Sequence, residues 1–394
     1  MSLRVLIAVT HLLGAGHLVR AAAIGRALNR RGHRVTLVSG GAPMPLADAS
    51  TLDLVQLPPV YCRVGDFSTL LGPDGAPADA IHLDRRRRLL LSTFAQLRPD
   101  IVVTEHFPFG RRSLAGEFQA LLDAAGAAAP PPLLLASVRD ILVAPTKPDR
   151  VERTHALVQR RYGGVLVHGD EAVLPLDRSW PVDAALRGKL IYTGYVGPDE
   201  AAEGAKAETA APARLADAPI LVSGGSSAAS LPLYRTALAA AEAAPPQPWH
   251  LLIGPGVDDA TFLALRGRAP AHASVERARP DFRALMAGAT VFVGQAGYNT
   301  VMDIFATGTR SVLVPFEHGR ETEQRLRAEA IADAGQATVL AEEHLTPEAL
   351  LAAIGRARSL PHPVFAVSLR GQDESARIIE RLAAAPPQAG EAAQ

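Results

Sequence analysis

The chain has 394 residues, of which 48% are hydrophobic and 20% charged, and equal numbers of basic and acidic residues leave it without net charge. This length and composition predict an ordinary globular chain of two domains, with three as the alternative. Only 5% of the residues are aromatic, so platforms that stack single-stranded nucleic acid are not expected and nucleic acid is not a predicted partner. The single Cys62 excludes intrachain disulfides and multi-cysteine metal sites.

The N-terminal segment passes from one arginine directly into an apolar strand and shows no signal-peptide pattern. No apolar run is long enough to cross a bilayer. We therefore expect a cytoplasmic protein whose membrane contact, at the inner face, is at most peripheral. Residues 1–196 carry 23 Lys and Arg against 17 Asp and Glu. That excess suits a phosphorylated or membrane-surface acceptor, and equally a plain basic surface.

Apolar strands alternate with helices in the first half, and strands are expected at residues 4–10, 34–39, 101–104, 133–136, 164–167 and 190–192. A helix over 18–31 places its four arginines, Arg20, Arg26, Arg30 and Arg31, largely away from the apolar face. A helix over 79–97, after a loop at 72–77, carries arginines at 85–88, which we expect on a solvated face.

The first strand, the turn containing Gly14 and Gly16 and the first helix form a βαβ unit of the doubly wound kind. The dinucleotide fingerprint is incomplete and no acidic residue ends the second strand, so an NAD enzyme is disfavoured. His17, beside this turn, suits a general base or a substrate-binding side chain, and equally a helix cap. Glu105 and Asp140 follow strands at the edge where sites form in such sheets, and the alternative for each is an ion pair with a nearby arginine.

Residues 199–217 are polar, rich in alanine and without apolar periodicity, and predict a linker. Beyond it, strands are expected at 220–222, 249–253, 274–276, 290–293 and 311–314, with Asp281 capping a helix that ends at Gly288. We expect an N-terminal domain over 1–198, a C-terminal domain over 218–365, a C-terminal helix within 366–385 and a disordered tail over 386–394.

Residues 290–324 carry the strongest functional signal. A strand, a turn from Gly294 to Gly297 and a helix over 299–306 predict an anion site, with Asn299 and Thr300 capping the helix and Gly308 ending it. Asp303, one turn into the helix, suits hydrogen bonds from a ribose diol. The alternative is a tight turn followed by a solvated acid.

Several motifs resemble the MurG family, N-acetylglucosaminyltransferases of the GT-B fold that make lipid II, and the resemblance spans about Val5 to Leu382. They are Gly14-Ala15-Gly16-His17, Thr193-Gly194-Tyr195-Val196, Gly224-Gly225-Ser226, Gly294-Gln295-Ala296-Gly297 with Thr300, and Val314-Pro315-Phe316-Glu317-His318 with Glu323-Gln324. The resemblance implies an α/β chain with two Rossmann-like domains facing a cleft, the first binding the acceptor and the second a nucleotide sugar.

The resemblance also implies roles for particular residues. Ser226 would bind the diphosphate, Asp303 the ribose, the backbone near Arg279 the base, and Glu323 and Gln324 the sugar hydroxyls. The full set of expected substrate-binding residues is Gly14, Gly16, Gly224, Gly225, Ser226, Arg279, Gly297, Tyr298, Asn299, Thr300, Asp303, His318, Glu323 and Gln324.

This chain departs from the family at three places. Asp303 stands where the family has Glu, Gln295 replaces an Arg, and Arg139-Asp140 replaces a His-Glu-Gln-Asn stretch. The fold and the donor class survive these differences, whereas the acceptor and the peptidoglycan reaction are not implied.

We therefore expect an inverting glycosyltransferase with a nucleotide diphosphate sugar donor, a UDP-hexose or UDP-N-acetylglucosamine type. The expected base is His17, Asp140 or Glu105. The acceptor is a hydroxyl of a small molecule, a glycan or a lipid-linked sugar. No Asp-x-Asp or metal-ligand cluster is found in the sequence, and we expect neither a metal nor another cofactor. The alternatives are a nucleotide-sugar hydrolase or 2-epimerase of the same fold, or a non-catalytic nucleotide-sugar-binding subunit.

Overall fold

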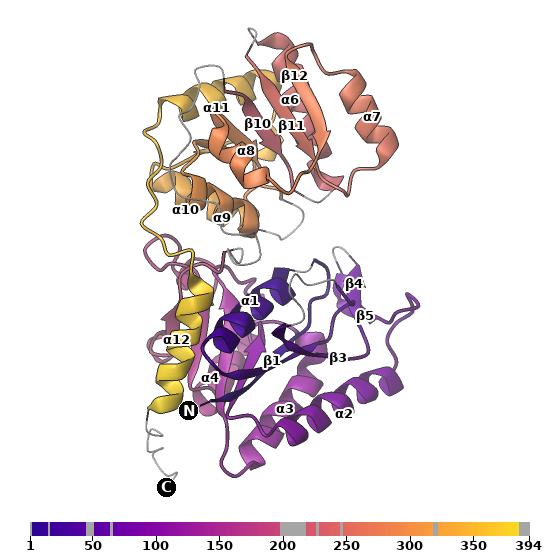
Figure 1. Ribbon diagram of the computed structural model, residues 1–394, viewed down its shortest axis with the longest axis vertical. Coiled ribbons are helices and arrows are strands. Elements are labelled where there is room, and N and C mark those ends of the chain that lie inside the picture. The colour runs from indigo at the N-terminus through magenta and orange to yellow at the C-terminus, as the bar shows by residue number, and fades with distance from the viewer. Residues whose placement is uncertain are drawn as a thin grey trace. The chain divides into compact units, whose positions relative to one another are not determined.

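The computed structural model describes residues 2–14, 16–44, 51–63, 66–197, 218–225, 228–244, 247–317 and 322–385 (Figure 1). The predicted linker and the predicted disordered tail lie outside the described residues. The chain divides into two compact units. The first comprises Met1–Glu171, Pro175–Ala205 and Arg370–Gln394, and the second comprises Ala172–Leu174 and Lys206–Leu369.

The first unit is built on a parallel sheet with the order β3-β2-β1-β6-β7-β8-β9. Its strands are β1 (Arg4–Val9), β2 (Arg34–Ser39), β3 (Asp53–Gln56), β6 (Ile101–Glu105), β7 (Leu133–Arg139), β8 (Gly164–His168) and β9 (Leu190–Tyr192). The order runs outward in both directions from β1 and β6, which pair directly with Val5 opposite Ile101. In a doubly wound sheet this reversal leaves a crevice at the carboxyl ends of the two central strands.

Alternate residues of β1 point to opposite faces of the sheet, and each face has its own core. Val5, Ile7 and Val9 pack with helix α1 (Gly16–Arg30) and helix α12 (Gly371–Ala384). Leu6 and Ala8 belong to the core on the other side. That side is covered by α2 (Ala80–Leu97), α3 (Ala115–Ala127) and α4 (Pro148–Arg161), with the short elements η2 (Arg112–Leu114), η3 (Leu176–Arg178) and α5 (Ala184–Arg187). Helix α12 therefore completes the first unit, although it lies at the end of the chain.

One expectation for arginines was wrong, and two further buried arginines were not foreseen. Arg20 and Arg26 on α1 are buried, because α12 covers a second face of this helix and Arg20 reaches the carboxyl edge of the sheet. In the run 85–88 on α2, Arg86 is fully buried while its three neighbours are exposed. One position in four of a helix faces its support, so even a run of charges sends one side chain inward.

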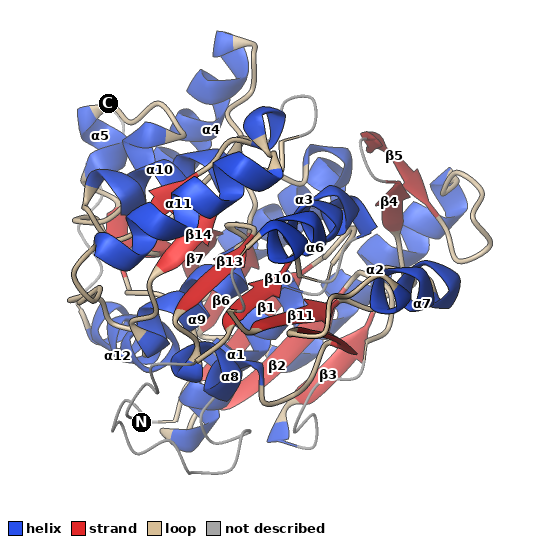
Figure 2. Cartoon of the chain, turned by 90° about the horizontal axis from the view of Figure 1, so that it is seen from above, coloured by secondary structure: helices blue, strands red, loops and turns tan. Residues whose placement is uncertain are grey.

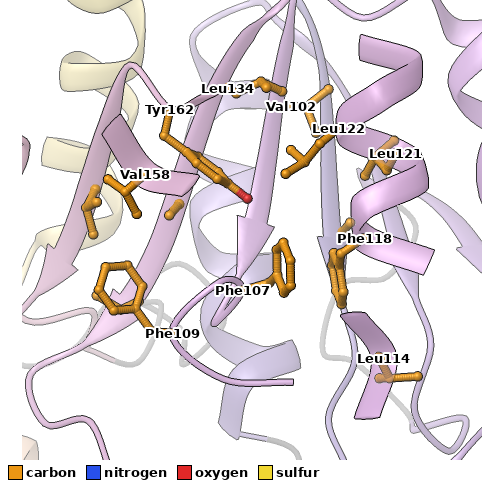
Figure 3. Close-up of a cluster of buried hydrophobic side chains, with 14 of the residues drawn as sticks. Val102, Phe107, Phe109, Leu114, Phe118, Leu121, Leu122, Leu134, Val158 and Tyr162 are labelled. Atoms are coloured by element: carbon orange, nitrogen blue, oxygen red, sulfur yellow. The ribbon is translucent and has the colours of Figure 1, made fainter. Parts of the chain in front are cut away.

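The loop after β6 is held by aromatic side chains (Figure 3). Phe107 stacks on Phe118 of α3 at 4.8 Å between ring centroids, and Phe109 meets Trp180 edge-on at 5.1 Å. These anchors fix His106 and Arg111 on either side of them. An antiparallel hairpin of β4 (Tyr61–Arg63) and β5 (Asp66–Leu71) was not foreseen, because its strands are short and carry no clear alternation.

The second unit repeats the same topology, with the strand order β12-β11-β10-β13-β14-β15, all parallel. Its strands are β10 (Ile220–Ser223), β11 (Trp249–Ile253), β12 (Ala273–Arg277), β13 (Val291–Gly294), β14 (Ser311–Leu313) and β15 (Thr338–Val339). Its helices are α6 (Leu231–Ala243), α7 (Asp259–Gly267), α8 (Phe282–Gly288), α9 (Tyr298–Thr307), α10 (Glu323–Asp333) and α11 (Pro347–Ser359), with η4 (Ala228–Ser230) and η5 (Glu342–His344) (Figure 2). The strand order reverses between β10 and β13. The α/β class with two Rossmann-like domains is thus confirmed.

Candidate functional site

The carboxyl edge of the first sheet brings together two residues that are far apart in the sequence. His17 lies in the first turn of α1, which follows β1, and Glu105 is the last residue of β6. His17 Nδ1 lies 2.9 Å from Glu105 Oε1, and the His17 side chain is 15% exposed while that of Glu105 is 1% exposed. An imidazole that reaches solvent and is backed by a buried carboxylate is the arrangement of a general base with its orienting group.

Burial and the neighbouring arginines determine the charge of both partners. Burial would raise the pKa of Glu105, but the Arg20 charge and hydrogen bonds from Ser137 and Arg20 hold this pKa below its usual value. Burial, with the charges of Arg111 and Arg20, holds the pKa of His17 well below its usual value. The acid is therefore ionised and the imidazole neutral at pH 7. An ionised carboxylate only accepts, so the 2.9 Å contact with Glu105 favours a proton on His17 Nδ1 and a lone pair on Nε2 that can accept a proton. Arg20 Nη2, which only donates, lies 3.0 Å from the same Nδ1 and favours the opposite tautomer.

A buried polar chain continues from Glu105 across the sheet. Ser137 on β7 donates to Glu105 Oε2, and Ser137 Oγ lies 2.9 Å from His168 Nε2 on β8. Thr193 Oγ1 lies 2.9 Å from His168 Nδ1. Burial lowers the pKa of His168 to about 3, so this ring is neutral and links Ser137 to Thr193 through both nitrogens. Sequence reasoning missed Ser137 and His168. The sequence did contain a signal for both, because Ser137 directly follows the predicted strand 133–136 and His168 directly follows the predicted strand 164–167.

Positive charge surrounds this dyad. Arg111 has a left-handed backbone (φ 59°) and donates from Nε to the Thr10 carbonyl at 2.6 Å. Burial and the charges of Arg139 and Arg20 lower its pKa to about 10, although Glu105 opposes this shift. His106 also has a positive φ of 67°, a conformation uncommon for a non-glycine residue, and its ring centroid lies 5.1 Å from that of His17. A Cβ on Gly110 would meet this ring at 2.2 Å, so Gly110 is required for the ring to lie there.

Asp140, the third candidate base, lies elsewhere in the site. It directly follows β7 and is fully buried, with its Cβ only 2.9 Å from where a Cβ on Gly169 would be. A carboxylate without solvent access needs a rearrangement before it can meet an acceptor.

Gly14 and Gly16 are exposed, and a Cβ at either position would meet nothing within 4 Å. Packing does not explain these glycines, whereas close approach of a ligand would.

In the second unit the turn after β13 depends on small residues. A Cβ on Gly294 would lie 2.4 Å from the carbonyl oxygen of Ser223 on the neighbouring strand, so only glycine fits. Helix α9 then begins with Gly297 as its N-cap, and no side chain caps it. The expectation that Asn299 and Thr300 cap the helix was therefore wrong: both lie within its first turn. Their backbone N–H groups, with that of Tyr298, belong to the turn that has no intrahelical acceptor, which is an anion-binding arrangement.

The second glycine turn, after β10, has a similar form. A Cβ on Gly224 would meet Ser230 Cβ at 2.0 Å, and Gly225 has a φ of 72°, so both positions require glycine. Ser226 of this turn and His318 of the loop after β14 lie outside the described residues, and their predicted roles stay predictions.

The segment before α8 is fixed by charge. Arg279 donates from Nε and Nη2 to the two carboxylate oxygens of Asp281 at 2.9 and 2.8 Å, and from Nη1 to Glu276 at 3.1 Å. Asp281 occupies the N-cap position but makes no side-chain cap bond, so the expectation that it caps the helix was wrong. Its carboxylate is used by Arg279 instead, and the expected contact between the backbone near Arg279 and a nucleotide base stays a prediction.

Glu323 and Gln324 begin α10, and both have partners within the protein. Gln324 Oε1 accepts from the backbone N–H groups of Ala296 and Phe316, each at 3.1 Å, and so joins the loops after β13 and β14. Glu323 Oε1 accepts from Arg327 at 3.0 Å, and the buried Arg327 also donates to the Ala296 carbonyl at 2.9 Å. Arg327 was missed by sequence reasoning. These contacts make Gln324 a brace between two loops, whichever ligand its amide group also meets.

The described residues show neither a candidate metal site nor a candidate membrane-spanning helix. No group of three or more His, Cys, Asp or Glu side chains in these parts of the chain is arranged to hold a metal ion. None of the described helices combines the length and the apolar composition that crossing a membrane requires.

Known proteins resemble this chain in sequence and in fold. Residues 219–382 match the family model of the Glycosyltransferase family 28 C-terminal domain. The chain is 27% identical over 368 residues to the UDP-N-acetylglucosamine–N-acetylmuramyl-(pentapeptide) pyrophosphoryl-undecaprenol N-acetylglucosamine transferase of Rhodopseudomonas palustris, covering 91% of this chain and 88% of the relative. Two solved structures are similar along their whole length. The glycotransferase of kitacinnamycin has 20% identity and a TM-score of 0.64, covering 97% of this chain and 99% of that one. MurG of Acinetobacter baumannii has 17% identity and a TM-score of 0.61, covering 96% and 99%.

Proposed function

We propose that this MurG-like chain of the GT-B fold moves a sugar from a UDP-sugar to a hydroxyl acceptor with inversion and without a metal. The first unit binds the acceptor in this proposal, and the second binds the donor. Uridine is the proposed nucleotide because the name of the relative gives a UDP-sugar. Asp303, one turn beyond the anion-binding end of α9, offers a carboxylate to the ribose of such a donor.

The observation that carries the mechanism is the His17–Glu105 pair. Its neutral imidazole presents Nε2 as the base, and the buried Glu105 stabilises the imidazolium that forms when the proton arrives. The acceptor oxygen forms a bond to the anomeric carbon while the bond from that carbon to the diphosphate oxygen breaks. The electron pair leaves with the diphosphate, whose charge the amides of the Gly224–Gly225 turn and of the first turn of α9 would stabilise. Glu105 is then an orienting group, and His17 rather than Asp140 is the base.

Calorimetry with UDP-, GDP-, dTDP- and CDP-sugars tests the donor, and product analysis with the bound donor alone tests the reaction. Rapid release of free sugar or formation of an epimer would refute transfer. With an acceptor in hand, His17→Gln should lower kcat about 10²- to 10⁴-fold without changing the donor Kd. His344→Gln, at an exposed histidine of the second unit, is the matched control and should change neither.

We also propose a peripheral membrane contact through α2. Its exposed residues Ile81 and Leu89 lie on the same helix as the exposed Arg85, Arg87 and Arg88. An apolar residue among cations suits the surface of an anionic bilayer. Flotation with vesicles containing anionic lipid should recover the wild type, and a variant with serine at the three arginines should be lost from that fraction. Equal recovery of both would refute this contact.

A further inference from the structure

Asp303 does not stand alone in the second unit. Arg283, the second residue of α8, donates to Asp303 Oδ1 from both Nε and Nη2, each at 3.0 Å. The Arg283 side chain is 27% exposed and that of Asp303 is 16% exposed. The pair is therefore largely enclosed, but a ligand can still reach it.

Stability alone is a weak reason for this pair. Helices α8 and α9 are already joined to the core through the buried Met286, whose carbonyl accepts from Thr309 Oγ1 at 2.9 Å, and through Phe282, which meets Phe292 edge-on. A partly exposed ion pair adds at most a small amount to such packing. Its place in the fold is more informative, because α8 continues the segment that holds Arg279 and α9 carries the anion-binding turn.

The geometry favours a role in which Arg283 orients the Asp303 carboxylate over one in which it blocks a ligand from reaching that carboxylate. A carboxylate offers about four lone-pair positions, and Arg283 takes two of them on one oxygen. Two donors on one oxygen fix the rotation of the short side chain, which removes the entropy that a ligand would otherwise lose in ordering it.

We propose that Arg283 is a positioning residue: it holds the Asp303 carboxylate in the orientation that accepts the ribose hydroxyls, and it thereby makes the protein select ribonucleotide over 2′-deoxyribonucleotide diphosphates. This inference rests on the proposed function, because it requires a nucleotide in the second unit. It adds a residue and a specificity that the anion-binding turn does not supply, since phosphate contacts cannot distinguish the two sugars.

Calorimetry with UDP and 2′-deoxy-UDP on four proteins tests it: the wild type, Asp303→Asn, Arg283→Met and Arg356→Met. Arg356 is an exposed arginine of the same unit, on α11, and serves as the matched control. The wild type and the control should bind UDP about tenfold or more tightly than 2′-deoxy-UDP, the worth of a hydrogen bond to a charged group. Arg283→Met should weaken the binding of UDP and reduce the preference for UDP over 2′-deoxy-UDP to about threefold or less, close to the value for Asp303→Asn.

The outcomes separate the two proposals. A wild type that binds neither ligand refutes the proposed function before Arg283 is tested. A wild type that binds both ligands equally, or an Arg283→Met variant that keeps the full preference, overturns the inference alone. Tighter UDP binding by Arg283→Met also overturns it, because Arg283 would then compete with the ribose. If Arg283→Met does not fold, Arg283→Lys replaces it. Lysine keeps the charge but lacks the two-donor fork, so an intermediate preference is expected and a full preference counts against the inference.

Discussion

Replacing Arg86 with Met should destabilise the first unit severely. Arg86 is fully buried and uses its whole guanidinium: Nε and Nη2 donate to the two oxygens of Glu117 at 3.0 and 2.9 Å, and Nη1 donates to the Gly40 carbonyl at 2.7 Å and to that of Pro58. It thus joins α2 and α3 to the segment after β2. A Cβ on Gly40 would lie 2.5 Å from Nη2, so the backbone has been shaped around this side chain.

The size of the effect follows from what remains after the substitution. Methionine fills much of the volume but leaves the Glu117 carboxylate buried without its cation, which costs about 3–5 kcal/mol. The double variant Arg86→Met/Glu117→Leu removes both charges and should recover most of this loss. Arg87→Met is the matched control one residue away. Arg87 is half exposed and paired with Asp84, so its loss should cost at most about 1 kcal/mol.

The distribution of tryptophan provides the assay. The chain has two tryptophans; Trp180 is buried in the core of the first unit and Trp249 in that of the second. In a Trp249→Phe background, Trp180 fluorescence therefore follows urea unfolding of the first unit alone. With an m-value of about 2–3 kcal/mol/M, the expected loss moves the midpoint down by about 1–2.5 M. A midpoint for Arg86→Met equal to that of Arg87→Met, or a double variant as unstable as the sum of its parts, would refute the reasoning.

Two further predictions concern the second unit and the C-terminal helix. Gln324→Leu removes the acceptor shared by two loop amides, so it should weaken UDP binding and lower the stability reported by Trp249 by about 1 kcal/mol; unchanged values for both would show that Gln324 is not a brace. Glu380 on α12 has a pKa lowered to about 2, chiefly by Arg31. A pKa lower in the folded than in the unfolded chain contributes stability above about pH 4.3 that is lost as the pH falls toward 2. Glu380→Gln should therefore show a smaller fall in stability across that window, and an identical fall would contradict this linkage.

The sequence predicted the parts of the fold that depend on local pattern. Uninterrupted apolar runs identified the central strands, and the run at 249–253 has the same bounds as β11. Gly308 ends α9 as expected, in the left-handed conformation. Pattern could not show that α12 packs on α1, because that contact joins residues more than 340 positions apart, such as Arg30 and Asp373. Without it, a buried Arg26 on α1 could not be foreseen.

The candidate site also has a part that the sequence pattern predicted and a part that only the packing shows. His17 and Glu105 were found because each follows a strand, and strand ends meet at one edge of a parallel sheet. Their pairing was not predictable, since it depends on which strands are neighbours and on how α1 turns its first residues. The partner of Asp303 was missed for a related reason. Arg283 looks like an ordinary surface arginine in the sequence, and only the packing of α8 beside α9 brings it to the carboxylate.

Catalysis by the His17–Glu105 pair has two opposite requirements at one pH: the acid must be ionised and the imidazole neutral. A carboxylate beside a histidine would ordinarily raise the histidine pKa and so protonate the base. Burial and the charge of Arg111 resolve this conflict on the histidine side, and Arg20, whose guanidinium contacts Glu105 and lies 3.0 Å from His17 Nδ1, adds to both shifts. The Arg20 charge lowers the pKa of Glu105 against the effect of burial and also lowers that of His17. The buried arginine on α1 thus contributes to both protonation states on which the proposed base depends.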